Sequence, residues 1–227
     1  MKKLTKLISA IVLLLAVMAS AVNAQQLFPI APNSVIASGN DNDVLRDWLD
    51  DQGIAPSGTL VYRRSSNGAS YSAFHTAVDD KGPTLIIFKT NTGEVFGGYT
   101  PDGWSSSYSG YRNNNNAFLF NLTSDRKATP YYPQNSIYSN SGHGPTFGGG
   151  HDIYLNNSMD GGYFNVHSYN SIDGSSYRSS TSLKALTGLN TTYTNQSFGA
   201  GFITEIEVYT IEFNASAPII QGEDIPV

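Results

Sequence analysis

The stretch TLIIFKTNTGEVFGGYT, residues 84–100, decides the fold class of this chain. Two runs rich in β-branched and aromatic residues flank the turn triplet NTG, and the second run contains a Gly-Gly pair. Strand-like runs joined by a short glycine-containing turn are typical of a β-hairpin. We therefore expect antiparallel strands over Thr84–Thr90 and Glu94–Thr100, with the rest of a sheet formed around them.

Similar strand-like runs occur on both sides of this hairpin. They cover residues 59–63, 117–122, 136–139, 152–155, 163–168 and 199–212. In the last run apolar residues roughly alternate with polar ones, among them Glu205 and Glu207, which predicts one buried and one solvent-facing side. The segment 105–116 ends in four consecutive asparagines and is predicted to be a mobile loop.

Two short helices are also predicted. Apolar residues within 44–49 share one helical face, and Asp41 or Asp43 suits the N-cap of that helix. Residues 70–78 show a similar pattern, with Ser70 as the cap. Strands dominate and the turns are rich in Gly and Asn. The chain is therefore predicted to be mostly β (α+β): a two-layer antiparallel β-sandwich with a few short flanking helices.

The first 24 residues have the layout of a cleavable secretory signal peptide. Three lysines precede the apolar run 7–17, and small residues occupy both positions that signal peptidase reads before cleavage after Ala24. The run is shorter than the ~20 residues that span a bilayer. We expect a secreted or periplasmic protein without a membrane span after cleavage. Because the chain has no cysteine, this leader favours a bacterial protein.

The predicted layout is a signal peptide over 1–24, an extended lead-in over 25–33, one domain over 34–213 and a polar tail over 214–227. The whole chain has 13 Lys and Arg against 18 Asp and Glu; removing the three lysines of the signal leaves 10 against 18, a net charge of −8. A net-negative chain is poorly matched to phosphate backbones. We therefore expect no nucleic-acid partner.

The densest chemical cluster is SGHGPTFGGGHD, residues 141–152. It lacks the spacing and the lysine of phosphate-binding loops, and its three consecutive glycines suit a tight crossing of the backbone. His143, His151 and Asp152 have metal-ligating side chains, but histidines of this kind mostly satisfy local backbone bonds. We therefore expect no metal and no other cofactor.

The candidate catalytic residues are His75, His151, Asp152, Glu205 and Glu207. His75 is a potential base, and the carboxylates are a potential acid pair of the kind that glycosidases use. No nucleophile elbow or complete triad motif accompanies them. A carbohydrate-binding module is the non-catalytic alternative, because the chain has 14 tyrosines and its loops mix Tyr, Trp104, Asn and Asp. Tyrosine also simply suits β-sheets.

A set of ordered segments resembles the TLDc domain, which occurs in eukaryotic oxidation-resistance proteins and in relatives fused to TBC or LysM domains. The segments are LVYR (60–63), FH (74–75), KGPTLIIFKT (81–90), VFGGYT (95–100) with Trp104, FLFNL (118–122), GPTFGGGHDI (144–153) and EIEVY (205–209). The resemblance spans 34–213. It implies a two-sheet β-sandwich with few helices and a link to oxidative-stress protection, and it carries over no accepted catalytic triad or cofactor.

The family motif positions in this chain are expected to be mostly structural, with the glycines for close sheet contacts and Trp104 for the core. They are Phe96, Gly97, Gly98, Trp104, Gly148, Gly149 and Gly150, together with His75, Asp152, Glu205 and Glu207. Several family members engage the vacuolar proton pump. The export signal and the missing companion domain put that partner in doubt for this chain.

Two functions are compatible with these observations. The favoured one is an exported, non-catalytic interaction module that binds a protein or a glycan and is linked to oxidative-stress protection. The alternative is an extracytoplasmic hydrolase-like enzyme acting on cell-wall or glycan polymers. The two differ in whether the candidate catalytic residues converge in one cleft.

Overall fold

The computed structural model describes residues 29–50, 56–170, 180–188 and 195–213. The predicted signal peptide, the first part of the lead-in and the predicted tail lie outside the described residues. At the described end of the lead-in, Ile30 and Ala31 are buried in a hydrophobic core. No helix in the described part of the chain is long and apolar enough to cross a bilayer.

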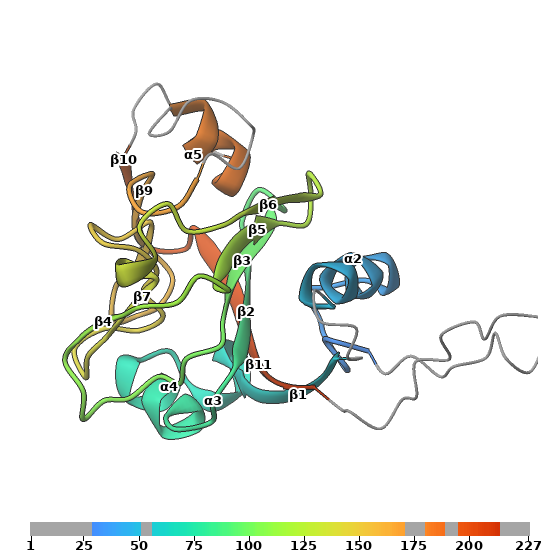
Figure 1. Ribbon diagram of the computed structural model, residues 1–227, viewed down its shortest axis with the longest axis horizontal. Helices are drawn as coiled ribbons and strands as arrows, with labels where there is room; N and C mark the ends of the chain where they lie inside the picture. Colours follow the sequence, from blue (N-terminus) through green and yellow to red (C-terminus); the bar gives the residue numbers. More distant parts are fainter. Residues whose placement is uncertain (1–28, 51–55, 171–179, 189–194, 214–227) are drawn as a thin grey trace, which may run out of the picture.

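A six-stranded antiparallel sheet forms the centre of the fold (Figure 1). Its strands are β1 (Pro56–Arg63), β2 (Thr84–Thr90), β3 (Val95–Thr100), β5 (Phe118–Asn121), β6 (Arg126–Ala128) and β11 (Ile203–Phe213), in the order β1-β11-β2-β3-β5-β6. The predicted hairpin is confirmed, since β2 and β3 pair from Thr84 opposite Thr100 to Lys89 opposite Val95. We call these six strands the large sheet.

Five shorter strands pack against one face of the large sheet. They are β4 (Gly110–Arg112), β7 (Ile137–Ser139), β8 (Ile153–Leu155), β9 (Gly162–Asn165) and β10 (Asn195–Phe198). β10, β9 and β8 pair in that order, and β4 pairs with β7. Phe147 makes single bridges to Ile137 of β7 and Ile153 of β8, so it joins the two groups. We call this combined layer the small sheet.

Two hydrophobic clusters lie on opposite faces of the large sheet. Between the sheets, Ile86, Phe88 and Val208 pack against Phe147 and Phe164. On the other face, helix α2 (Gly39–Leu49) covers a second cluster through Leu45 and Leu49. Figure 1 shows the large sheet between the small sheet and α2. The predicted mostly β sandwich with few short helices is thus confirmed.

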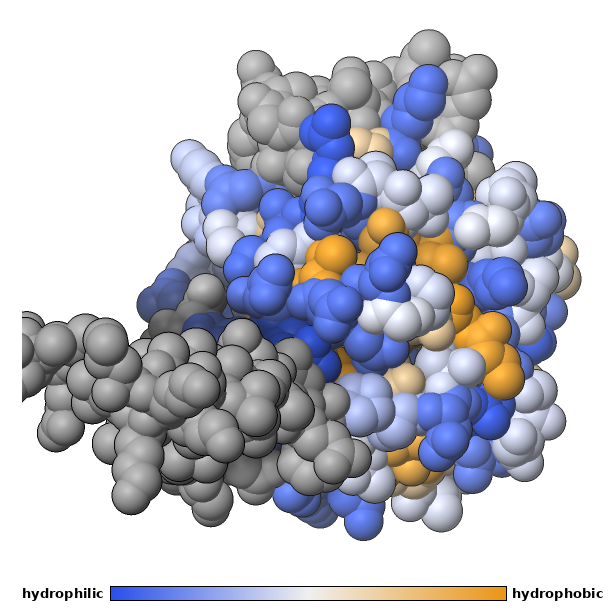
Figure 2. Space-filling model, turned by 90° about the vertical axis from the view of Figure 1, so that its right-hand side faces the viewer, coloured by the Kyte–Doolittle hydropathy of each residue, from blue (hydrophilic) through white to orange (hydrophobic). Residues whose placement is uncertain are grey.

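On the face shown in Figure 2, apolar residues reach the surface only as broken patches among hydrophilic ones.

The helix ends show which capping predictions hold. Ser70 caps α4 (Tyr71–Val78), as predicted, by accepting from the backbone N–H of Ala73. The cap of α2 was predicted wrongly: Ser38 is the N-cap, and Asp41 is the third helical residue. The Asp41 carboxylate accepts from the Ser38 backbone N–H at 2.6 Å, which completes a capping box.

Three short helices complete the described secondary structure. They are α3 (Arg64–Asn67), the 3₁₀ helix η1 (Pro133–Asn135) and α5 (Ser180–Thr187).

Two strand-level predictions were wrong. The segment predicted as a loop over 105–116 contains β4, because polar residues are sufficient for an edge strand that buries little. The predicted wet side of β11 is not wet at Glu207, which is fully buried. β11 lies between β1 and β2 in the sheet, and the chain around Ser34 covers the face of β11 on which Glu207 lies. The alternation of polar and apolar residues along β11 therefore does not predict which of its side chains are exposed.

Candidate functional site

His75 and Asp79 lie one turn apart on α4. That spacing places them on the same helical face, and His75 Nδ1 is 2.6 Å from Asp79 Oδ1. The other ring nitrogen, Nε2, faces the carbonyl oxygens of Asn140 at 3.0 Å and His143 at 2.8 Å. Both ring nitrogens therefore have oxygen partners within the fold. His75 ties the 140–143 loop to α4.

The Asp79 carboxylate also accepts a hydrogen bond from the loop at Ser106. Its Oδ2 accepts from the backbone N–H of Ser106 at 2.7 Å. Burial opposes ionisation of Asp79, but the hydrogen bonds from Ser106 and His75 prevail and lower its pKa below the usual range. An open polar cleft of about 400 Å³ lies over this pair; its lining is Ser72, His75, Thr76, Asp79, Ser106 and Ser141. Since His75 Nε2 faces backbone carbonyls, it is not directed at a cleft hydroxyl that it could activate.

Asp152 is buried at the start of β8 and fastens the chain after β9. Its carboxylate accepts from the backbone N–H groups of His167 at 2.8 Å, Ser168 at 2.8 Å and Tyr169 at 3.3 Å. Burial raises the pKa of Asp152 to about 7, against these donors, which lower it. A cavity beside it measures about 10 Å³, which is room for one water at most. Asp152 therefore has no space for a substrate.

The two histidines of the Gly-rich cluster lie close together, without Asp152. The rings of His143 and His151 are 5.7 Å apart, and Tyr154 lies 5.4 Å from each. Burial lowers the pKa of both, and a neighbouring histidine lowers each further. Within the described ranges no three His, Cys, Asp or Glu side chains converge as metal ligands. The three residues first considered as a metal site are thus divided between two environments.

Glu207 lies on the α2 side of the large sheet. It accepts from Arg63 Nε at 2.9 Å, Val35 N–H at 3.0 Å and Tyr209 O–H at 2.9 Å, and from the Ser34 hydroxyl. Tyr209 belongs to the core cluster under α2, whereas His75 and Asp152 belong to the opposite side. Counting the second Arg63 nitrogen at 2.7 Å, the Glu207 carboxylate thus makes five polar contacts within the fold.

Glu205 serves a separate contact on the same strand. Its carboxylate accepts from the backbone N–H of Ser65 in α3 at 3.1 Å and from that of Ile206 at 3.0 Å. Neither Glu205 nor Glu207 lines the cleft over His75. The five candidate catalytic residues therefore make separate contacts, and the structure does not bring them together in one cleft.

The motif residues of β3 lie at the closest approach of strands and sheets. A Cβ on Gly97 would lie 1.9 Å from the carbonyl oxygen of Ile86, and one on Gly98 would lie 2.6 Å from the ring of Phe147. Phe96 is fully buried in the core between the sheets. Glycine at both positions therefore lets the small sheet pack directly onto β3.

Trp104 and the three consecutive glycines hold the two layers together. The buried Trp104 donates from Nε1 to Thr84 Oγ1 at 2.9 Å. Gly148 and Gly150 have φ of +80° and +82°, and a Cβ on Gly149 would meet Asn135 at 2.5 Å. The first glycine also leaves room for Asp152, because a Cβ there would lie 1.9 Å from its carboxylate.

Sequence reasoning missed several residues of these sites. Asp79 was detectable, because it follows His75 by four positions on a predicted helix. The pairing of Arg63 with Glu207 had no sequence signal, since 144 positions separate them. The aromatic surface formed by Tyr111, Tyr138 and Tyr154 was hidden within the general abundance of tyrosine.

Comparisons with known proteins give a family match and two relatives. The family model described as "TLDc domain" matches residues 31–212. The chicken (Gallus gallus) MTOR-associated protein MEAK7 is 28% identical over 116 residues, which cover 48% of this chain and 24% of that protein. The Drosophila melanogaster GTPase-activating protein skywalker is 30% identical over 80 residues, 32% of this chain and 14% of that protein. The matches thus span a quarter or less of these relatives.

Proposed function

Since the chain belongs to the TLDc family, whose model matches 182 of its 227 residues (31–212), we propose that it is an exported, non-catalytic binding module. One observation carries this proposal: the five candidate acids and bases lie in separate environments, and the carboxylates of Asp152, Glu205 and Glu207 already accept hydrogen bonds within the fold. Asp152 is closed off from substrate, and Glu207 is neutralised by Arg63. The hydrolase alternative needed these groups in one cleft, so it has no geometric support in the described residues.

The proposed location outside the cytoplasm rests on the leader, Met1 to Ala24. A basic n-region, an apolar run and small residues before the cleavage point favour a secreted or periplasmic bacterial protein. The names of the two relatives refer to MTOR and to GTPase activation. We assign neither role to this chain, because the matched parts are small fractions of those proteins.

A link to oxidative-stress protection is retained on family grounds and would act through binding. After removal of the leader the chain has no cysteine and one methionine, Met159. That methionine is buried, with its sulfur 3.8 Å from the hydroxyl of Tyr62. Direct scavenging of oxidants by thiols or exposed methionines is therefore not available to it.

The proposal is tested on the whole chain produced in a bacterium. We expect the exported form to begin at Gln25. We also expect the purified mature protein to release no soluble sugars from peptidoglycan sacculi, cellulose or chitin. Glu205→Ala and the exposed Glu212→Ala on the same strand provide a matched pair of variants. Turnover that Glu205→Ala abolishes and Glu212→Ala preserves would overturn the non-catalytic assignment.

A further inference from the structure

The outer face of the small sheet presents one tyrosine from each of four strands. Tyr111 of β4 pairs directly with Tyr138 of β7, and Tyr154 of β8 pairs directly with Tyr163 of β9. Directly opposed residues of antiparallel strands point to the same side of a sheet. The residues on either side of Tyr138 and Tyr154 are buried, so these two rings point away from the core.

Two histidines close the gap between the two tyrosine pairs. The ring of Tyr138 lies 5.0 Å from Tyr111 and 5.0 Å from His143. His151 stacks on Tyr154 at 5.4 Å with an interplanar angle of 30°. We call this surface the tyrosine–histidine face; it consists of Tyr111, Tyr138, His143, His151, Tyr154 and Tyr163.

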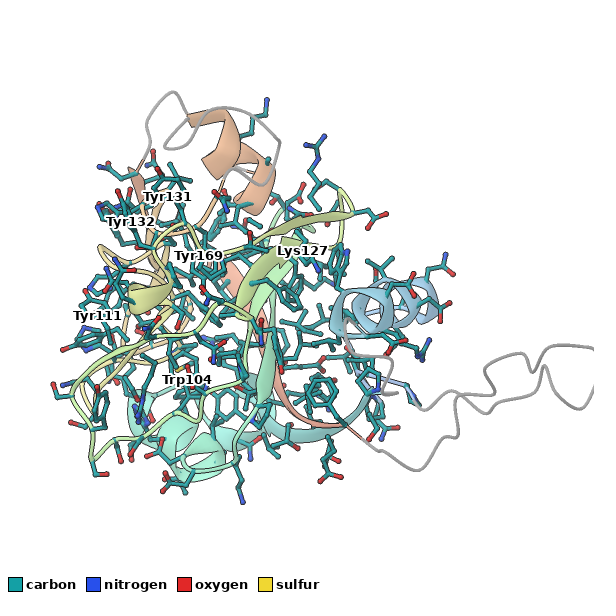
Figure 3. All side chains as sticks on the ribbon, viewed as in Figure 1. Trp104, Tyr111, Lys127, Tyr131, Tyr132 and Tyr169 are labelled. Atoms are coloured by element: carbon teal, nitrogen blue, oxygen red, sulfur yellow. The ribbon has the colours of Figure 1, made fainter. Side chains whose placement is uncertain are left out.

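The face is open to solvent on the side away from the large sheet. Tyr111 is 40% exposed, and the other members are half-buried. In Figure 3, Tyr111 lies at the outer margin of the small sheet, whereas Trp104 and Tyr169 lie inside the molecule. The rings are therefore accessible to solvent, and contacts with neighbouring rings and with the strands fix their positions.

The chemistry of the face is aromatic, polar and uncharged. Burial lowers the pKa of His143 and His151, so both rings are neutral around pH 7. The amides of Asn140 and Asn165 lie beside the two histidines: Asn140 Oδ1 is 3.4 Å from His143 Nδ1, and Asn165 Nδ2 donates to the carbonyl of Gly150 at 3.1 Å. A charged peptide or a phosphate ligand finds no complementary charge among the residues of this face.

We propose that the tyrosine–histidine face binds a neutral polysaccharide. Pyranose rings have apolar C–H faces that stack on aromatic rings, and hydroxyls that pair with amide and phenol groups. Tyr111 lies directly opposite Tyr138, and Tyr154 directly opposite Tyr163, so each pair presents two neighbouring rings to successive sugars of an extended chain. This inference rests on the proposed function and names its ligand class.

The test measures retention of the mature protein by glycans. Microcrystalline cellulose and chitin are sedimented with the protein, and soluble neutral glucan is used in affinity electrophoresis. Tyr111→Ala is the test variant because Tyr111 is the most exposed ring of the face. Phe213→Ala is the control, since this aromatic residue is 37% exposed but belongs to the large sheet. Thermal melts confirm that both variants fold.

We expect the wild-type protein to bind at least one of these glycans. Tyr111→Ala should weaken that binding about tenfold, and Phe213→Ala should leave it unchanged. Binding to none of them, or equal loss of binding in both variants, would overturn the glycan assignment. Those results would not contradict the proposed function, an exported and non-catalytic binding module. Turnover of a bound glycan would instead overturn the proposed function and retain the site.

Discussion

Replacing Arg63 with methionine is expected to destabilise the fold strongly, because it leaves the buried Glu207 carboxylate without its cation. The side chain of Glu207 is fully buried and that of Arg63 is 19% exposed, with nitrogen and oxygen 2.7 Å apart. Breaking a buried ion pair on one side costs about 3–5 kcal/mol. Glu207 retains three donors, from Ser34, Val35 and Tyr209, so we expect the lower end, about 3 kcal/mol.

Urea denaturation followed by far-UV circular dichroism and by tryptophan fluorescence measures this loss. In a thermal melt it corresponds to a decrease in Tm of about 6–12 °C. The double variant Arg63→Met/Glu207→Gln removes both charges and should be about 2 kcal/mol more stable than the sum of the single changes predicts. A single-variant effect within about 0.5 kcal/mol, or strict additivity, would refute the assignment of Glu207 as an Arg63-neutralised structural group.

Three further predictions follow from the other sites. Gly98→Ala should cost about 2 kcal/mol in urea denaturation, because the added methyl group meets the ring of Phe147; a neutral effect would contradict the close packing of the sheets there. Asp79→Asn should destabilise the protein at neutral pH, because it weakens the hydrogen bond to His75, and should flatten the loss of stability in acid. The lowered pKa of Asp79 gives stability that is present above about pH 4 and is lost as the pH falls further, so equal acid profiles of wild type and variant would disprove this. The pKa of Asp152 is raised to about 7 in the folded protein, so its contribution to folding stability is full below about pH 4 and is lost as the pH rises through 7. The Asp152→Asn variant should therefore lose less folding stability than the wild type between pH 5 and pH 8, as measured by urea denaturation.

The residues that were predictable from sequence are those whose signals are local. The hairpin over residues 84–100 needs only β-forming runs and a glycine turn, and both strands are found where expected. The Ser70 cap also depends on neighbours three positions away. The cap of α2 was misassigned because aspartate and serine are both good cap residues, and only the entry direction of the chain distinguishes Ser38 from Asp41.

The candidate site required the folded chain. His75, Asp152, Glu205 and Glu207 all have catalytic chemistry in isolation, and nothing in their spacing separates a cleft from a set of structural anchors. The sheet does separate them, because Glu207 faces α2 whereas Asp152 holds the chain after β9 on the other side.

The sequence alone determined the central hairpin, the sandwich class and the family of this chain, and it alone carries the prediction of an export signal. Each of these depends on composition, on short-range periodicity or on the order of motifs. Only the tertiary structure decided that Glu207 is buried against Arg63, and that four distant tyrosines share a face with two histidines. The physical reason is that charge neutralisation and surface formation depend on strand order and register. These bring together residues 144 positions apart in the ion pair and residues from 111 to 163 in the tyrosine–histidine face.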